Sequence, residues 1–122
     1  MTFLVADDSK LARAKIIDFL ETLGHAVIGE AVDGIDAIER YRELSPTCVT
    51  IDLEMPRMNG IDAACEILRV HPKAIILLIT SMRDKKELLK ATDIGIYATV
   101  HKPITLETLS QICIKIEKER PQ

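Results

Sequence analysis

Five short apolar runs alternate with five amphipathic segments along the 122 residues of the chain. This alternation predicts an α/β fold, in which a parallel sheet carries helices on both faces. The run at residues 74–79 is apolar at every position, as expected of a parallel strand that is buried on both sides. Polar residues end several of the runs abruptly, which places them at the carboxyl edge of the predicted sheet.

The first two units are bounded by helix-capping and helix-ending residues. Residues 3–6 form a short apolar strand, and Ser9 can cap a helix that runs to about residue 23, where Gly24 ends it. Residues 25–30 form the second strand. Asp33 precedes a glycine that opens a second helix, which runs to about residue 44.

The third unit begins with a strand at residues 48–51 and continues through a loop to a helix. Gly60 is expected to permit a close turn in this loop. Helical spacing then predicts one buried face made of Ile61, Ala64, Cys65 and Leu68.

The last two units follow the same pattern. After the strand at residues 74–79, Asp84 and Glu87 have capping-box spacing for a short helix to about residue 92. Residues 96–100 form the fifth strand. Thr105 caps the last helix, whose predicted apolar face comprises Leu106, Leu109, Ile112, Cys113 and Ile116.

The composition excludes several classes of protein. The longest strongly apolar run, residues 74–79, is far short of the roughly 20 residues that a membrane-spanning helix needs. A net charge of −3 and an aromatic content of 3% argue against a nucleic-acid-binding surface. The three cysteines form no CxxC pair, so we expect reduced, buried and inert thiols at Cys48, Cys65 and Cys113. His25 and His101 are expected to be structural rather than metal or phosphorelay residues.

Several side chains with complementary chemistry follow the predicted strands. They are Asp7 and Asp8 after the first strand, Asp52 after the third, Thr80 after the fourth and Lys102 after the fifth. In a parallel sheet these positions meet at one edge. Three neighbouring carboxylates repel one another, and a hard cation such as Mg²⁺ or Mn²⁺ relieves that repulsion. An aspartate beside a cation, a lysine and a hydroxyl group is suited to accept a phosphoryl group.

These residues resemble the receiver domain of two-component response regulators, of the chemotaxis-regulator type. The resemblance covers residues 1–122 and rests on residues 5–9, residues 51–60 and the Thr80-Ser81 and Lys102-Pro103 pairs. Within residues 51–60, the pattern Asp-x-x-Met-Pro-x-Met-x-Gly is highly specific to this family.

The resemblance implies one receiver domain over residues 1–122, with a flavodoxin-like (βα)5 doubly wound sheet of strand order 2-1-3-4-5. It implies that Asp52 accepts a phosphoryl group from a sensor histidine kinase, with Thr80 as the switch hydroxyl and Lys102 as the amine that pairs with the phosphate. It also implies a cis Lys102-Pro103 bond. The implied ligands of Mg²⁺ or Mn²⁺ are Asp7, Asp8, Asp52 and the backbone carbonyl of Glu54.

Phosphorylation is expected to remodel the surface formed by the fourth helix, the fifth strand and the fifth helix, which a downstream partner protein or an output domain reads. No direct nucleic-acid binding by this domain and no membrane association are expected, and the expected location is the cytoplasm. The domain is expected to catalyse only its own phosphorylation and dephosphorylation.

The chain departs from the family pattern at one position, and two further positions vary within the family. The family usually has an aromatic residue three positions before the lysine, where this chain has Thr99. Tyr97 has the same parity along the strand and could point to the same face. Glu54 and Met82 lie at positions that vary within the family and tune the lifetime of the phosphoryl group, and Met82 is expected to shield that group from solvent.

Two alternatives stay open at this stage, and a third is excluded. The domain could be the N-terminal receiver of a longer regulator. A haloacid-dehalogenase-type phosphatase also phosphorylates an aspartate, but it needs a second aspartate two residues further on, where this chain has Glu54. A nucleotide-binding module would need a glycine-rich phosphate loop, and neither GxGxxG nor GxxxxGK[ST] is present.

Overall fold

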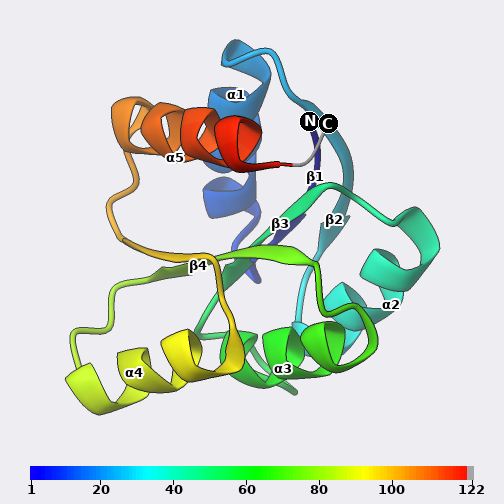
Figure 1. Cartoon of the computed structure of the whole chain (residues 1–122), viewed down its shortest axis with the longest axis vertical. Helices are drawn as coiled ribbons and strands as arrows, with labels where there is room; N and C mark the ends of the chain where they lie inside the picture. Colours follow the sequence, from blue (N-terminus) through cyan, green and yellow to red (C-terminus); the bar gives the residue numbers. More distant parts are fainter. Residues whose placement is uncertain (121–122) are drawn as a thin grey trace.

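The sheet has five parallel strands in the order β2-β1-β3-β4-β5, as predicted (Figure 1). These observations come from a computed structural model, which describes residues 1–120. The strands are β1 (Thr2–Ala6), β2 (Ala26–Ala31), β3 (Cys48–Asp52), β4 (Ile75–Thr80) and β5 (Ala98–His101). The helices are α1 (Lys10–Thr22), α2 (Gly34–Leu44), α3 (Gly60–Val70), α4 (Lys85–Ile94) and α5 (Leu106–Glu119).

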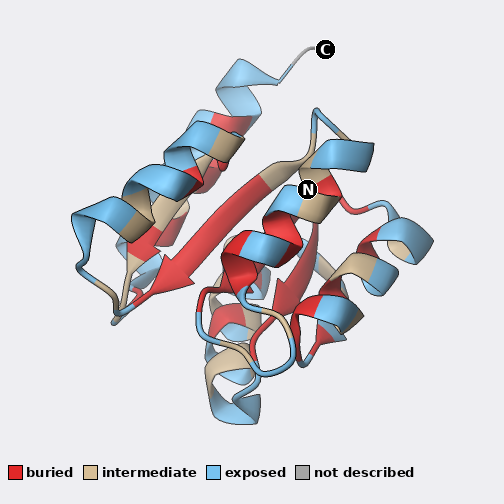
Figure 2. Ribbon diagram, turned by 90° about the horizontal axis from the view of Figure 1, so that it is seen from below, coloured by how far each residue is buried: buried red, intermediate tan, exposed pale blue. Residues whose placement is uncertain are grey.

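The helices cover the two faces of the sheet unequally. Helices α1 and α5 lie on one face, and α2, α3 and α4 lie on the other (Figure 1). Each face has its own hydrophobic cluster, and in the view of Figure 2 the central strands are buried between them. We call these the α1–α5 cluster, which includes Phe3, Ile79 and Val100, and the α2–α4 cluster, which includes Leu4, Ile51 and Leu78.

Side-chain caps start the helices largely where the sequence predicts. Ser9, Asp33 and Thr105 each accept a hydrogen bond from a backbone N–H in the first turn of their helix, as predicted. Asp84 caps α4 through the N–H of Lys86, while Glu87 pairs with Lys90, so no capping box forms there. Asn59, which the sequence analysis passed over, caps α3.

The predicted buried face of α3 is wrong at one position. Cys65 is exposed, so the expectation of three buried thiols holds only for Cys48 and Cys113. The helix instead buries Ala63 and Ile67 together with the predicted Ile61 and Ala64. The error arose because a cysteine is apolar enough to fit the spacing pattern, while the small Ala63 gave no strong signal of its own. On α5, Leu106, the first residue of the helix, is likewise exposed.

The turn before α3 requires a glycine, as predicted. A Cβ atom at Gly60 would clash with the carbonyl oxygen of Asp52, because it would lie far inside van der Waals contact. The N–H of Gly60 donates to the carbonyl of Leu53, and the N–H of Leu53 donates to the carbonyl of Ile79. The loop after β3 is therefore folded tightly back over the end of its own strand. None of the helices in residues 1–120 is long and apolar enough to span a membrane.

Candidate functional site

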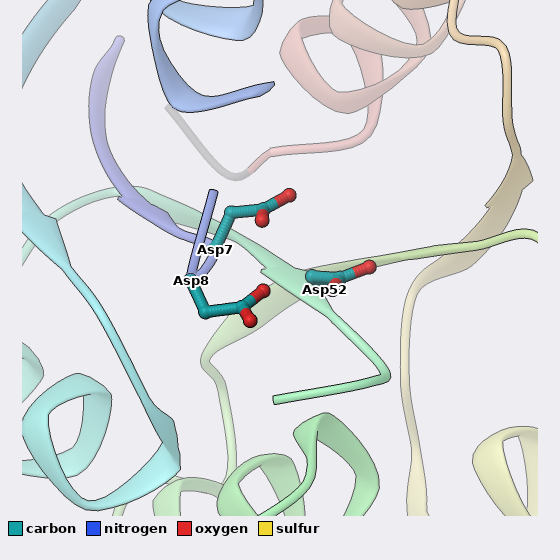
Figure 3. Close-up of side chains that lie close together, drawn as sticks. All are labelled: Asp7, Asp8 and Asp52. Atoms are coloured by element: carbon teal, nitrogen blue, oxygen red, sulfur yellow. The ribbon is translucent and has the colours of Figure 1, made fainter. Parts of the chain in front are cut away.

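The carboxyl ends of β1 and β3, which are neighbours in the sheet, bring three aspartates together. Oxygen atoms of Asp7, Asp8 and Asp52 all lie within 4.8 Å of one another. Figure 3 shows Asp7 and Asp8 extending from the end of β1 toward the side of Asp52. Asp7 and Asp52 are buried and Asp8 is exposed, so the cluster opens to solvent on the Asp8 side.

Backbone groups hold Asp7 in place. Its N–H donates to the carbonyl of Ala31, which links it to β2. Its Oδ1 accepts from the N–H of Ser9, and its carbonyl accepts from the Arg13 guanidinium. Its Oδ2 is buried and has no hydrogen-bond partner among the described residues. The carboxylate is thus fixed in position with one oxygen left for a further ligand.

Asp52 is the carboxylate whose ionisation the site opposes. Burial raises its pKa to about 6, and the charges of Asp7 and Asp8 act in the same direction. Lys102 opposes this shift, because its Nζ lies 3.0 Å from Asp52 Oδ1. Asp52 is therefore a buried carboxylate with an amine beside it, and its role as the phosphoryl acceptor stays a prediction.

Lys102 reaches the cluster from the end of β5. Its Nζ also lies 3.6 Å from Asp7 Oδ2, so it bridges two of the three acids. Burial lowers the pKa of Lys102, but the hydrogen bond to Asp52 and the charges of Asp52 and Asp7 outweigh this and raise it overall. The amine therefore stays protonated. The Lys102-Pro103 bond is cis, as predicted.

Thr80 ends β4 and is buried. Its Oγ accepts a hydrogen bond of 2.9 Å from the N–H of Met82, and its carbonyl accepts from the N–H of Lys102. The hydroxyl is therefore engaged by the loop that follows its own strand. Met82 packs against the α2–α4 cluster, and its predicted role in shielding a phosphoryl group stays a prediction.

An ion pair that the sequence analysis missed fixes the loop between β3 and α3. The Nε of Arg57 lies 3.0 Å from Oδ2 of Asp33, the buried cap of α2. The N–H of Gly34 also donates to the carbonyl of Met58. Arg57 adopts a left-handed backbone conformation with φ of 66°. No pattern of residue types in the loop predicts this conformation. Glu54 is exposed on the same loop, and the role of its carbonyl stays a prediction.

The residues at this edge fit a hard divalent cation. Three carboxylates offer oxygen atoms, and within residues 1–120 no histidine or cysteine joins them, which is the donor set that Mg²⁺ and Mn²⁺ prefer. Oδ2 of Asp7 supports this fit, because it makes no hydrogen bond within residues 1–120 and has only the Lys102 amine 3.6 Å away, whereas a buried carboxylate oxygen is normally hydrogen-bonded or bound to a metal.

Tyr97 lies on a different face of the sheet from position 99. Its hydroxyl donates a hydrogen bond of 2.5 Å to Glu119 of α5, and its ring packs against the α1–α5 cluster. Val100 belongs to the same cluster, so strand alternation directs Thr99 to the opposite face. Tyr97 precedes Ala98, the first residue of β5. The alternation of side chains along the strand therefore does not apply to Tyr97, although Tyr97 and Thr99 are two residues apart.

Comparisons with known proteins agree with this geometry. The sequence profile of the response regulator receiver domain matches residues 3–114. Chemotaxis protein CheY of Thermotoga maritima is 35% identical over 115 residues, which cover 94% of this chain and 96% of that protein. A two-component response regulator of the LuxR family from Aurantimonas superposes with a TM-score of 0.90 at 31% identity, covering 98% of this chain and 86% of that one. A chain of the CheX–CheY–BeF3–Mg complex from Borrelia burgdorferi gives a TM-score of 0.92 at 22% identity, covering 96% and 89%, and supports the fold alone.

Proposed function

The chain belongs to the response regulator receiver family, and on this premise we propose that Asp52 accepts a phosphoryl group from a sensor histidine kinase. Receiver domains act in phosphorylation-dependent signalling and are not enzymes in the ordinary sense. The domain, over residues 1–122, promotes only the transfer to its own aspartate and the later hydrolysis. The observation that carries this proposal is the meeting of three carboxylates and one lysine at the ends of β1, β3 and β5.

The transfer uses an oxygen of Asp52 as the nucleophile. This oxygen forms a new P–O bond while the P–N bond of the donor phosphohistidine breaks, and the electron pair stays on the leaving imidazole. Lys102 Nζ, now 3.0 Å from Asp52 Oδ1, pairs with an oxygen of the transferred group. Asp7 stays fixed by its bonds to Ser9 and Ala31, so this carboxylate needs no rearrangement.

Asp7, Asp8, Asp52 and the backbone carbonyl of Glu54 would hold Mg²⁺ or Mn²⁺ beside the acceptor. The cation, when bound, neutralises the charge that develops on the phosphoryl oxygens. Lys102 supplies a second positive charge from the side of β5.

Phosphorylation then changes the hydrogen bond of Thr80. A phosphoryl group adds about two negative charges and strong acceptor oxygens at Asp52. The Thr80 hydroxyl, which now accepts from Met82, turns to donate to one of these oxygens. The loop between β4 and α4 follows it, and the surface of α4, β5 and α5 changes shape for a partner protein or an output domain.

Exposure of the protein to acetyl phosphate tests this function. We expect the mass to rise by one phosphoryl group in the presence of Mg²⁺, and not to rise in EDTA or in the Asp52→Asn variant. Asp62→Asn, which changes an exposed aspartate on α3, serves as the matched control and should be labelled like the wild type. Labelling that survives Asp52→Asn would contradict the assignment.

The same experiment separates the alternatives. A haloacid-dehalogenase-type phosphatase releases many phosphate molecules per chain, whereas a receiver retains one. Free phosphate that accumulates far beyond the protein concentration, within the time needed to label the protein, would favour the enzyme. We also propose a cytoplasmic location and no direct nucleic-acid or membrane contact by this domain. These proposals rest on its net charge of −3 and its family.

A further inference from the structure

One histidine lies directly beside the switch hydroxyl. In the pairing of β4 with β5, Thr80 stands opposite His101. Ile79 and Val100, the residues just before them, both belong to the α1–α5 cluster. Strand alternation therefore directs the side chains of Thr80 and His101 to the other face of the sheet, where they are neighbours.

The side chain of His101 is partly buried and partly exposed. Its Nδ1 is buried and has no hydrogen-bond partner within residues 1–120, while the residue as a whole is partly exposed. A buried ring nitrogen without a partner is unusual in a native protein and calls for a physical reason. His101 is also the one aromatic ring that β5 contributes to this face, because position 99 is a threonine.

The hydroxyl of Thr80 has hydrogen-bonding capacity that changes with the state of the site. A hydroxyl carries one donor and two lone pairs. In this structure one lone pair accepts from the N–H of Met82. When Thr80 turns its O–H toward a phosphoryl oxygen, its oxygen still carries a lone pair that can accept a hydrogen bond from a further donor.

We propose that His101 supplies this donor and thereby transmits the position of Thr80 to the partner surface formed by α4, β5 and α5. Its Nδ1–H donates to the Thr80 oxygen in the phosphorylated state and has no partner in the resting state. The ring moves with the hydroxyl, and its outer edge alters the surface. This inference deepens the proposed function and rests on phosphorylation at Asp52.

Nitrogen NMR of the histidine rings tests the proposal on the full chain. Beryllofluoride with Mg²⁺ serves as the phosphoryl mimic, and ¹⁹F NMR reports whether it binds. We expect the Nδ1 signal of His101 to shift on binding. His25 and His71 are built-in controls, because they precede β2 and β4 at the opposite edge of the sheet and should not shift.

The two possible failures are distinguishable. Absence of bound beryllofluoride would overturn the proposed function, whereas bound beryllofluoride with an unchanged His101 signal would overturn this inference alone.

Two matched variants provide a second readout. His101→Phe keeps an aromatic ring and removes both nitrogens, and His71→Phe makes the same change far from the site. We expect both variants to accept a phosphoryl group at the wild-type rate. Backbone amide shifts in α4, β5 and α5 on adding the mimic should fall by about twofold or more in His101→Phe and stay unchanged in His71→Phe. Wild-type shifts in His101→Phe would refute the role of its nitrogen.

Discussion

Replacement of the phosphoryl acceptor is expected to stabilise the metal-free protein. The pKa of Asp52 is raised from 3.8 to about 6, chiefly by burial. Each pKa unit corresponds to about 1.4 kcal/mol, so ionising this carboxylate in the fold costs about 3 kcal/mol at pH 7. The amide introduced by Asp52→Asn carries no charge and avoids this cost. We therefore expect Asp52→Asn to raise the free energy of unfolding in EDTA by up to about 3 kcal/mol.

The sign of the pH dependence follows from the raised pKa. Below pH 3.8 the carboxyl group is protonated in both the folded and the unfolded states and costs nothing. Between pH 3.8 and about 6 the unfolded chain has lost this proton while the folded chain still holds it, so the wild type loses stability as the pH rises through this window. The advantage of Asp52→Asn should therefore grow by about 2 kcal/mol between pH 4.5 and pH 7.

Urea unfolding followed by circular dichroism measures this difference at both pH values. Asp18→Asn, at an exposed position on α1, is the matched control and should change stability by less than about 0.5 kcal/mol. Saturating Mg²⁺ should reduce the advantage of Asp52→Asn, because the cation stabilises the folded wild type more than the variant. An advantage that is absent at pH 7, or equal at both pH values, would refute the electrostatic reasoning.

Variants at four further positions test other parts of the site. Gly60→Ala places a Cβ against the carbonyl of Asp52, so it should cost about 1–3 kcal/mol in urea unfolding and slow labelling by acetyl phosphate. Arg57→Ala and Arg57→Gly both lose the ion pair to Asp33, the cap of α2. Alanine is strained at the positive φ of this position and glycine is not, so Arg57→Gly should be the more stable of the two by about 1 kcal/mol. Lys102→Met should still be labelled, but amide shifts in α4 and β5 on adding beryllofluoride should shrink; full wild-type shifts would contradict its role. Met82→Ala should shorten the lifetime of the phosphoryl group in a mass-resolved decay, and an unchanged lifetime would count against shielding.

Most of the fold could be predicted from the sequence because two kinds of pattern agree. The apolar runs and helix caps place the same elements that the polar residues after the strands require. Apolar runs bounded by caps such as Ser9 and Thr105 mark the elements, and the residues just after the strands define the site. Periodicity failed at Cys65, where an apolar residue faces solvent. It also failed at Tyr97, which lies outside the regular strand and so does not obey its alternation.

Contacts between loops were the part that no sequence pattern could supply. The ion pair of Arg57 with Asp33 joins residues that are 24 positions apart and come from two loops. Its formation depends on the left-handed backbone at Arg57 and on the close approach that Gly34 allows. Neither condition is visible in residue types alone, because each depends on where the other loop lies.

The acidic cluster destabilises the fold, and the same cluster allows the site to respond to a phosphoryl group. Both effects have one physical origin. Asp7 and Asp52 are buried close together because β1 and β3 are neighbours at the point where the chain changes sides of the sheet. The fold must therefore hold repelling charges, and Lys102 compensates for only part of that repulsion. A cation and a phosphoryl group change the charge at this same point. The free energy of their binding can then act on Thr80, whose hydroxyl is held by a single hydrogen bond from its own loop. A neutral, well-packed site would be more stable. A phosphoryl group bound there would have little effect on the position of Thr80.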